Sequence, residues 1–282
     1  MKEGRASRTA MMVAYMRALA NVGATHVRDF HDPTAHIYLN AKWAARLARV
    51  RGQLRAGRET MGLAFARVSA DMLALRTRTI DSAVCDAIHA GTRQVVILGA
   101  GLDGRAWRMK ELAGVRVFEV DHPATQAFKR AHLDRLPSMI GLVSFVAVDF
   151  EREQLGPALD AVGHNPRQPT CWIWEGVVMY LTHDTMCATL DTIAARSAPD
   201  STLIVNYHTS MRSPFIRLAL RFLREPVKSA ASPAEMAGDL GQAGFDVIED
   251  SGTRDWAARF TDGGVDTRVG RAMRIVVARR RR

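Results

Sequence analysis

Two glycines spaced one residue apart follow a run of apolar residues, and they are the strongest chemical signal in the chain. The run Val95-Val96-Ile97-Leu98 leads directly into Gly99-Ala100-Gly101. Four consecutive apolar residues are typical of a buried parallel strand. Glycine can adopt positive φ, and its missing Cβ lets a ligand contact the backbone. We therefore expect Gly99 and Gly101 to form a tight turn over a bound small molecule.

Acidic residues end the next two apolar runs along the chain. Asp121 closes Val117-Phe118-Glu119-Val120, and Asp149 precedes Phe150 at the end of the run 142–150. An acid at the tip of the second strand typically accepts hydrogen bonds from ribose hydroxyls. An acid beside an aromatic residue suits adenine, because the acid accepts from the amino group and the aromatic side chain packs on the ring. The pattern predicts a cofactor that contains a nucleoside.

Two cofactor classes compete for this pattern. Gly99, Gly101 and Gly104 satisfy G-x-G-x-x-G, which is the fingerprint of nicotinamide dinucleotides. S-adenosylmethionine (AdoMet) has a ribose and an adenine but no phosphate, so it needs only two glycines for close approach. The acid and aromatic at Asp149 and Phe150 favour AdoMet over a dinucleotide.

Three segments stand out, and the last two are far more specific than the glycine turn. They are residues 94–108, which include the turn, Phe118-Glu119-Val120-Asp121-His122-Pro123-Ala124-Thr125, and Trp174-Glu175-Gly176-Val177-Val178-Met179-Tyr180-Leu181. Together they resemble the bacterial class I methyltransferases related to leucine carboxyl methyltransferase. The resemblance covers about residues 60 to 250, and a weaker similarity lies at Asp32-Pro33-Thr34-Ala35. Members of that family usually carry threonine where this chain has Gly104, so we expect a looser turn here.

The resemblance implies a role for each residue of an AdoMet site. Gly99 lines the methionine end, Asp121 binds the ribose hydroxyls, and Asp149 with Phe150 holds the adenine. Glu175 binds the methionine ammonium group, and an upstream arginine binds its carboxylate. Arg76 is the better match for that arginine and Arg78 is the runner-up. The two clamps make chemical sense, because a carboxylate binds an ammonium and a guanidinium binds a carboxylate.

Structural roles are the alternatives at these positions. Asp121 is also placed to cap a helix that begins near Pro123. Arg76 is also placed to pair with Asp81 or Glu59 on a solvated helix. Each of these structural roles would explain the residue type at its position even if no ligand binds there.

From residue 94 onward, strand and helix patterns alternate, which is typical of a parallel sheet covered by helices. Strands are predicted near 94–98, 115–120, 142–148, 171–175, 202–207, 245–249 and 272–279. The last two, joined by a long loop through Gly263-Gly264, suit an antiparallel hairpin at the edge. The pattern thus predicts the α/β fold class, and the resemblance implies the Rossmann-like, mostly parallel seven-stranded sheet of class I methyltransferases. We expect a helical extension over residues 1–92, a core over 93–282, and a helical insertion near 211–231 that lines the substrate.

Composition sets further limits. The chain has 282 residues, of which 48 % are apolar, enough for one large core. Its three cysteines show no metal-ligand spacing, so we expect no disulfide and no metal. No apolar run is long enough to span a membrane. We therefore expect a cytoplasmic protein that does not act at a membrane.

The chain is strongly basic, with 39 Lys and Arg against 29 Asp and Glu. This raises a nucleic-acid methyltransferase as a rival hypothesis. However, the only dense basic run is 279–282, and no aromatic residues interleave a basic stripe. We expect a small-molecule methyl acceptor instead. The sequence does not indicate an oligomeric state.

The acceptor decides whether a general base is needed. A hydroxyl must lose a proton, whereas a carboxylate is already ionised at neutral pH. His208 and Tyr207 are the candidate bases, because they end the predicted strand 202–207 where ligands of such sheets bind. His183 is a third choice. The sequence thus predicts transfer to an oxygen of a small molecule. The alternatives are a protein carboxyl methyltransferase, a nucleic-acid methyltransferase and a non-catalytic AdoMet-binding protein.

Overall fold

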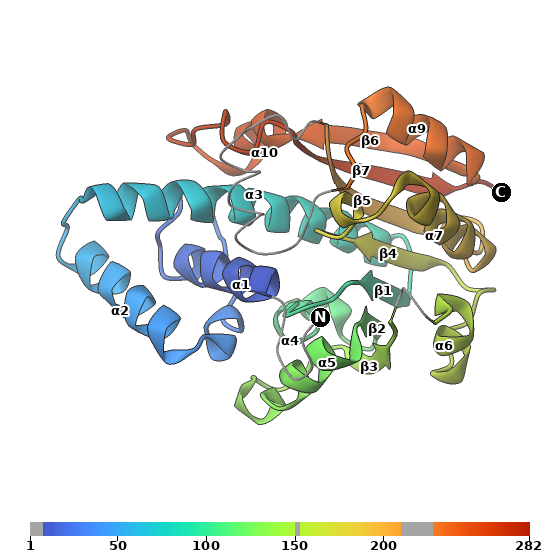
Figure 1. Cartoon of the computed structure of the whole chain (residues 1–282), viewed down its shortest axis with the longest axis horizontal. Helices are drawn as coiled ribbons and strands as arrows, with labels where there is room; N and C mark the ends of the chain where they lie inside the picture. The colour runs from blue at the N-terminus through green and yellow to red at the C-terminus, as the bar shows by residue number, and fades with distance from the viewer. Residues whose placement is uncertain (1–7, 150–152, 210–227) are drawn as a thin grey trace.

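The computed structural model describes residues 8–149, 153–209 and 228–282. They contain a seven-stranded sheet with the strand order β3-β2-β1-β4-β5-β7-β6 (Figure 1). The strands are β1 Gln94–Leu98, β2 Arg116–Asp121, β3 Leu142–Ala147, β4 Thr170–Trp174, β5 Thr202–His208, β6 Phe245–Gly252 and β7 Met273–Arg280. Every predicted strand is present, and none differs from its predicted bounds by more than three residues.

The sheet is mostly parallel. Strands β1 to β5 pair in parallel, whereas β7 pairs antiparallel with both β5 and β6. The predicted fold class and the antiparallel edge hairpin are therefore confirmed. The connection between β6 and β7 is not the plain loop that we expected, because it contains helix α10 (Thr253–Phe260). Asp255 stabilises the start of that helix by accepting a 2.8 Å hydrogen bond from the backbone N–H of Gly252.

Helices surround the sheet and connect its strands. They are α1 Arg8–Asn21, α2 Ala41–Arg55, α3 Met61–His89, α4 Arg105–Arg108, α5 Pro123–Arg130, α6 Leu155–Ala161, α7 His183–Ala195, α9 Pro233–Gln242 and α10. Ser232 and Glu235 form a reciprocal capping box at the start of helix α9.

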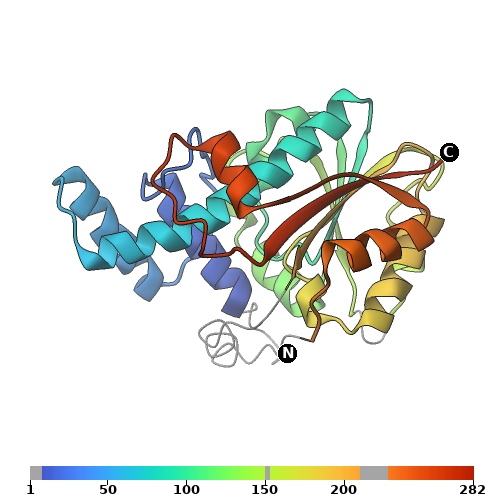
Figure 2. The same cartoon turned by 90° about the horizontal axis from the view of Figure 1, so that it is seen from above.

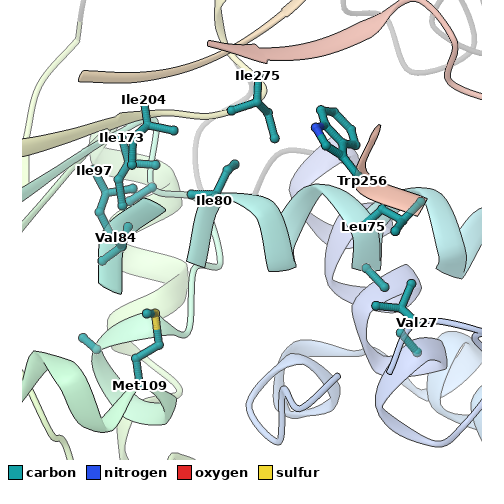
Figure 3. Close-up of a cluster of buried hydrophobic side chains, with 14 of the residues drawn as sticks. Val27, Leu75, Ile80, Val84, Ile97, Met109, Ile173, Ile204, Trp256 and Ile275 are labelled. Carbon is teal, nitrogen blue, oxygen red and sulfur yellow. The ribbon is translucent and has the colours of Figure 1, made fainter. Parts of the chain in front are cut away.

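The two faces of the sheet bury different sets of side chains. Helices α3 and α10 cover one face, where Ile80 and Val84 of α3 meet the isoleucines of the strands (Figure 3). Helices α6, α7 and α9 cover the other face, where they pack against Trp172, Trp174 and Tyr207. Because side chains alternate along a strand, neighbouring residues of one strand serve different faces.

Helices α1 and α2 and the first half of α3 lie to one side of the sheet (Figure 2). The second half of α3 packs on the sheet itself, so the predicted extension over 1–92 contributes to the core. Most of the predicted insertion at 211–231 lies outside the described residues. Among the described helices, none is long and apolar enough to cross a membrane.

Candidate functional site

The glycine turn after β1 requires glycine at two positions. Gly99 has φ +66° and Gly101 has φ +52°, both in the left-handed region that side chains disfavour. A Cβ on Gly99 would also collide with Cγ2 of Val177, which follows β4. The turn after β1 and the segment after β4 therefore touch at a point that only glycine permits.

Gly99→Ala is expected to lower the free energy of unfolding by about 2–4 kcal/mol. The left-handed φ costs roughly 1–2 kcal/mol for alanine, and the collision with Val177 adds overpacking. Urea denaturation would measure the loss. The double variant Gly99→Ala/Val177→Ala removes the collision and keeps the φ cost, so part of the stability should return. A double variant no more stable than Gly99→Ala would contradict this explanation.

Asp121 ties the glycine turn to the end of β2. Its Oδ2 accepts a hydrogen bond from the Gly101 N–H at 2.5 Å, and its Oδ1 accepts from the His122 N–H at 2.6 Å. Burial raises the pKa of Asp121 above its usual value, although both hydrogen bonds oppose that shift. Helix α5 is capped instead by His122, whose Nδ1 accepts from the Ala124 N–H at 3.1 Å. The interpretation of Asp121 as the cap of this helix is therefore wrong.

Asp149 lies just beyond β3, beside the end of β2. The Val148 N–H donates to the Asp121 carbonyl at 2.9 Å, and the Asp149 N–H donates to Glu153 Oε2 at 2.8 Å. Asp149 is thus close along the sheet edge to the turn that Asp121 holds. Phe150, the predicted aromatic partner of adenine, lies outside the described residues.

Arg76 and Glu175 meet as an ion pair. Arg76 comes from the middle of α3, and Glu175 directly follows β4. The Arg76 Nε lies 2.7 Å from Glu175 Oε1, and Arg105 Nη1 lies 3.0 Å from Glu175 Oε2. Burial opposes ionisation of Glu175, but the Arg76 and Arg105 guanidiniums hold its pKa below the usual value. The structure therefore places a positive and a negative charge side by side, 10 % and 14 % exposed.

Arg78, the runner-up for binding the methionine carboxylate, does not join this ion pair. Asp81 and Glu59, the alternative partners of Arg76, pair with other arginines. Arg78 points to α10, where its guanidinium stacks 5.4 Å from the centre of the Phe260 ring. Asp81 pairs with Arg105 and Arg108, and Glu59 pairs with Arg67. Pairing of Arg76 with Asp81 or Glu59 is therefore wrong.

His208 and Tyr207 face opposite sides of the sheet. His208 lies near Arg76; burial and the Arg76 charge lower the pKa of His208 to about 4. Its Nδ1 is buried and has no hydrogen-bond partner among the described residues. Tyr207 packs among the tryptophans on the other face, and its hydroxyl donates to Asp250 Oδ2 at 2.6 Å. Strand alternation thus separates Tyr207 from the ion pair.

His183, the third candidate base, is exposed at the start of α7. Its Nε2 lies 3.1 Å from Oδ1 of Asp239 on α9. We define the candidate site as the described residues that gather around the glycine turn and the ion pair. They are Arg76, Gly99, Gly101, Asp121, Asp149, Glu175 and His208.

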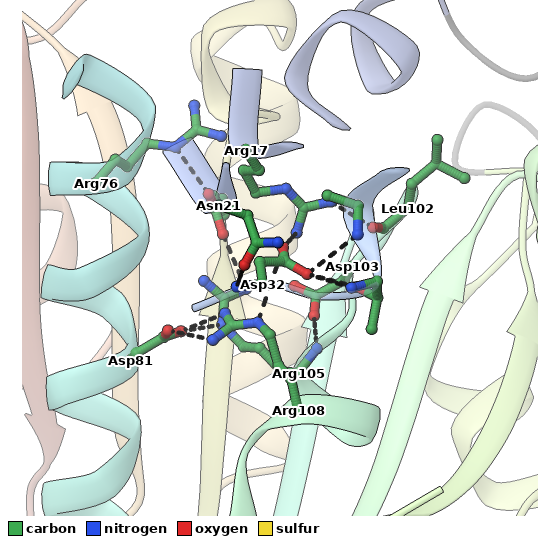
Figure 4. A network of polar contacts seen from close by, with 12 residues as sticks. Arg17, Asn21, Asp32, Arg76, Asp81, Leu102, Asp103, Arg105 and Arg108 are labelled. Atoms are coloured by element: carbon green, nitrogen blue, oxygen red, sulfur yellow. Dashed lines mark hydrogen bonds and ion pairs between the residues drawn. The ribbon is translucent and has the colours of Figure 1, made fainter. Parts of the chain in front are cut away.

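A buried network of charges lies beside the candidate site, and the sequence did not indicate it (Figure 4). Arg105 pairs with Asp81 at 2.8 Å and also contacts Asp103. Arg108 pairs with Asp81 at 2.7 Å. These residues join α3, the glycine turn and α4. Only their presence in or near the segments that resemble the methyltransferase family could have indicated them.

The same network reaches α1. Arg17 lies 3.1 Å from Asp32 and donates to the Leu102 carbonyl at 2.5 Å. Thr34 donates to Asp32 at 2.6 Å. A Cβ on Gly104 would collide with the Thr34 Oγ1, so Thr34 fills the space beside this glycine. The structure shows a closely packed turn here, where we expected a loose one.

Comparisons with known proteins bear on the family and the fold of the chain. The family model described as leucine carboxyl methyltransferase matches residues 10–194. A Mycolicibacterium paratuberculosis protein, provisionally named an S-adenosyl-L-methionine-dependent methyltransferase, is 38 % identical over 204 residues. The match covers 71 % of this chain and 66 % of that relative.

Two solved structures share the fold. A DUF574 family protein from Streptomyces avermitilis superposes with a TM-score of 0.61 at 16 % identity, covering 98 % of both chains. Magnesium protoporphyrin IX methyltransferase from Synechocystis, solved with bound SAH, gives a TM-score of 0.51 at 16 % identity. That match covers 86 % of this chain and 96 % of the other. At these identities the likeness supports the fold alone.

Proposed function

The chain belongs to the leucine carboxyl methyltransferase family, and from this premise we propose that it transfers a methyl group from AdoMet to an oxygen of a small molecule. The observation that supports this most is the Arg76–Glu175 ion pair beside the glycine turn. It offers one charge of each sign where a zwitterionic amino acid would bind.

The residues present fit AdoMet. Glu175 would bind the ammonium of its methionine part, and Arg76 would bind the carboxylate. Gly99 leaves room for close approach, and Asp121 would accept from the ribose hydroxyls. When bound, AdoMet supplies a methyl group on a sulfonium, which an oxygen nucleophile displaces in line. The chain contributes proximity and alignment, which are worth roughly 7–11 kcal/mol in such reactions.

Titration calorimetry tests the cofactor. The protein is expected to bind AdoMet and S-adenosylhomocysteine but not NAD. Asp121→Ala should weaken AdoMet binding about ten- to a hundredfold, because charge-assisted hydrogen bonds of roughly 1.5–3 kcal/mol are lost. Asp134→Ala, which removes an exposed acid from the short helical turn that follows α5, should bind like wild type. Tight NAD binding without AdoMet heat would contradict the proposal, and wild-type affinity in Asp121→Ala would exclude Asp121 as a ligand.

The acceptor is tested with AdoMet that carries a labelled methyl group, incubated with an extract of the source cells. We expect label in the small-molecule fraction. Label in protein would support the protein carboxyl alternative, and label in nucleic acid would support the nucleic-acid alternative. Cofactor binding without any transfer would indicate a non-catalytic protein. Mild base separates the two oxygen acceptors, because it releases label from methyl esters but not from methyl ethers.

A further inference from the structure

Three side chains of metal-ligating type meet where α7 and α9 pack on the same face of the sheet. His183 and Cys187 lie one helical turn apart on α7, and Asp239 lies on α9. His183 Nε2 is 3.1 Å from Asp239 Oδ1 and 3.7 Å from Cys187 Sγ. The nitrogen, sulfur and oxygen atoms all lie within 4.8 Å of one another. None of the three residues belongs to the candidate site.

We propose that His183, Cys187 and Asp239 bind a divalent transition-metal ion of the zinc class, with solvent in the remaining position. Bond lengths to zinc of about 2.0–2.3 Å place the ligands of a tetrahedral site roughly 3.3–3.6 Å apart. The distances from His183 Nε2 to Asp239 Oδ1 and to Cys187 Sγ, 3.1 and 3.7 Å, lie close to that range. Imidazole and thiolate ligands favour zinc and its neighbours over magnesium or calcium.

The proposed ligands differ in their exposure to solvent. The Asp239 side chain on α9 is 11 % exposed, whereas the His183 side chain is 65 % exposed. Cys187 Sγ lies at similar distances, 3.7 and 3.8 Å, from the two ring nitrogens. Nε2, which lies close to both the sulfur and the carboxylate, is therefore the His183 nitrogen placed to bind an ion between them.

The local electrostatics favour a cation. The carboxylates of Asp184, Asp191 and Asp239 lie close enough to the Cys187 thiol for their negative charges to act on it. Among the described residues, no Lys or Arg forms an ion pair with these three carboxylates. A bound cation would reverse this field and stabilise the thiolate. The chain has a net charge of +10, yet acidic side chains gather around the three proposed metal ligands.

Cobalt titration of the reduced protein tests the site directly. Co²⁺ bound by a thiolate gives a charge-transfer absorption in the near ultraviolet, and we expect it to saturate at one ion per chain and to be displaced by Zn²⁺. Cys187→Ser should abolish this absorption, and His183→Gln or Asp239→Asn should weaken binding by about tenfold or more. Cys85→Ser is the matched control, because Cys85 is a partly exposed thiol on α3. A missing band, or a band unchanged in Cys187→Ser, would overturn the proposal.

Thermal unfolding gives an independent measurement. Zn²⁺ should raise the melting temperature of the wild-type protein and of Cys85→Ser, because a ligand of the native state stabilises it. Cys187→Ser should melt at the same temperature with and without Zn²⁺, while circular dichroism shows that it is folded. An equal shift in Cys187→Ser would also overturn the proposal.

Discussion

Arg105→Leu is expected to lower the free energy of unfolding by about 3–5 kcal/mol. Arg105 is 2 % exposed and contacts the carboxylates of Asp81, Asp103 and Glu175. Leucine replaces the volume but not the charge. Three buried carboxylates would then lose a shared partner, and their desolvation would no longer be offset.

Urea denaturation, followed by circular dichroism, would measure this loss. Arg268→Leu is the control, because Arg268 pairs with Asp266 on the surface and its side chain is 86 % exposed. An exposed pair of this kind contributes about 1 kcal/mol or less. Arg105→Lys should fall between wild type and Arg105→Leu, since an ammonium keeps the charge but not the fork geometry. If Arg105→Leu lost no more stability than Arg268→Leu, the network would not stabilise the fold.

His208→Ala is expected to lower kcat by roughly 10²- to 10⁴-fold if the acceptor is a hydroxyl. His208 is the candidate base because it lies at the end of β5 beside Arg76, with a neutral imidazole at neutral pH. AdoMet affinity should be unchanged. If the acceptor is a carboxylate, no base is needed, and the same substitution should act mainly on KM.

The pH dependence follows from the lowered pKa of His208. Burial and the Arg76 charge place this pKa at about 4, so the imidazole is protonated and unable to accept a proton only below that pH. We expect kcat/KM to be flat between mildly acidic and neutral pH and to fall near pH 4. A carboxylate acceptor also titrates near pH 4. The substitution, rather than the pH profile, therefore separates the two chemistries.

Steady-state kinetics on the true acceptor would measure both parameters. Tyr207→Phe is the control, because it removes a hydroxyl that bonds Asp250 on the opposite face of the sheet. Its kcat should stay close to that of wild type. A His208→Ala enzyme with full kcat and an unchanged pH profile would eliminate His208 as the base.

The strands, and the positions of Gly99 and Asp121 at their ends, could be predicted from the sequence. The apolar runs that end in Gly99 or Asp121 indicate strands that are buried on both faces, and the glycine indicates the backbone conformation of the turn. Both are local properties. Such properties depend on neighbouring residues along the chain, so the strands could be predicted within three residues. Helix α10 lies where we expected a loop, although its start depends on a local contact of Asp255 with the Gly252 N–H.

Which side chains meet depends on contacts between elements that are distant in the sequence. Arg76 and Arg78 are two residues apart, and their different directions around α3 send one to Glu175 and the other to Phe260. His208 and Tyr207 are adjacent in sequence, yet the pleat of β5 places them on opposite faces.

The contacts in the charge network and at the proposed metal site were even harder to predict from the sequence. Arg17 lies 85 residues from Leu102 in sequence, and His183 lies 56 residues from Asp239. No local pattern specifies such contacts, because charges are common on helices and most of them face solvent. Packing of the helices against one sheet brings these groups within hydrogen-bonding distance, and this packing is a property of the whole fold.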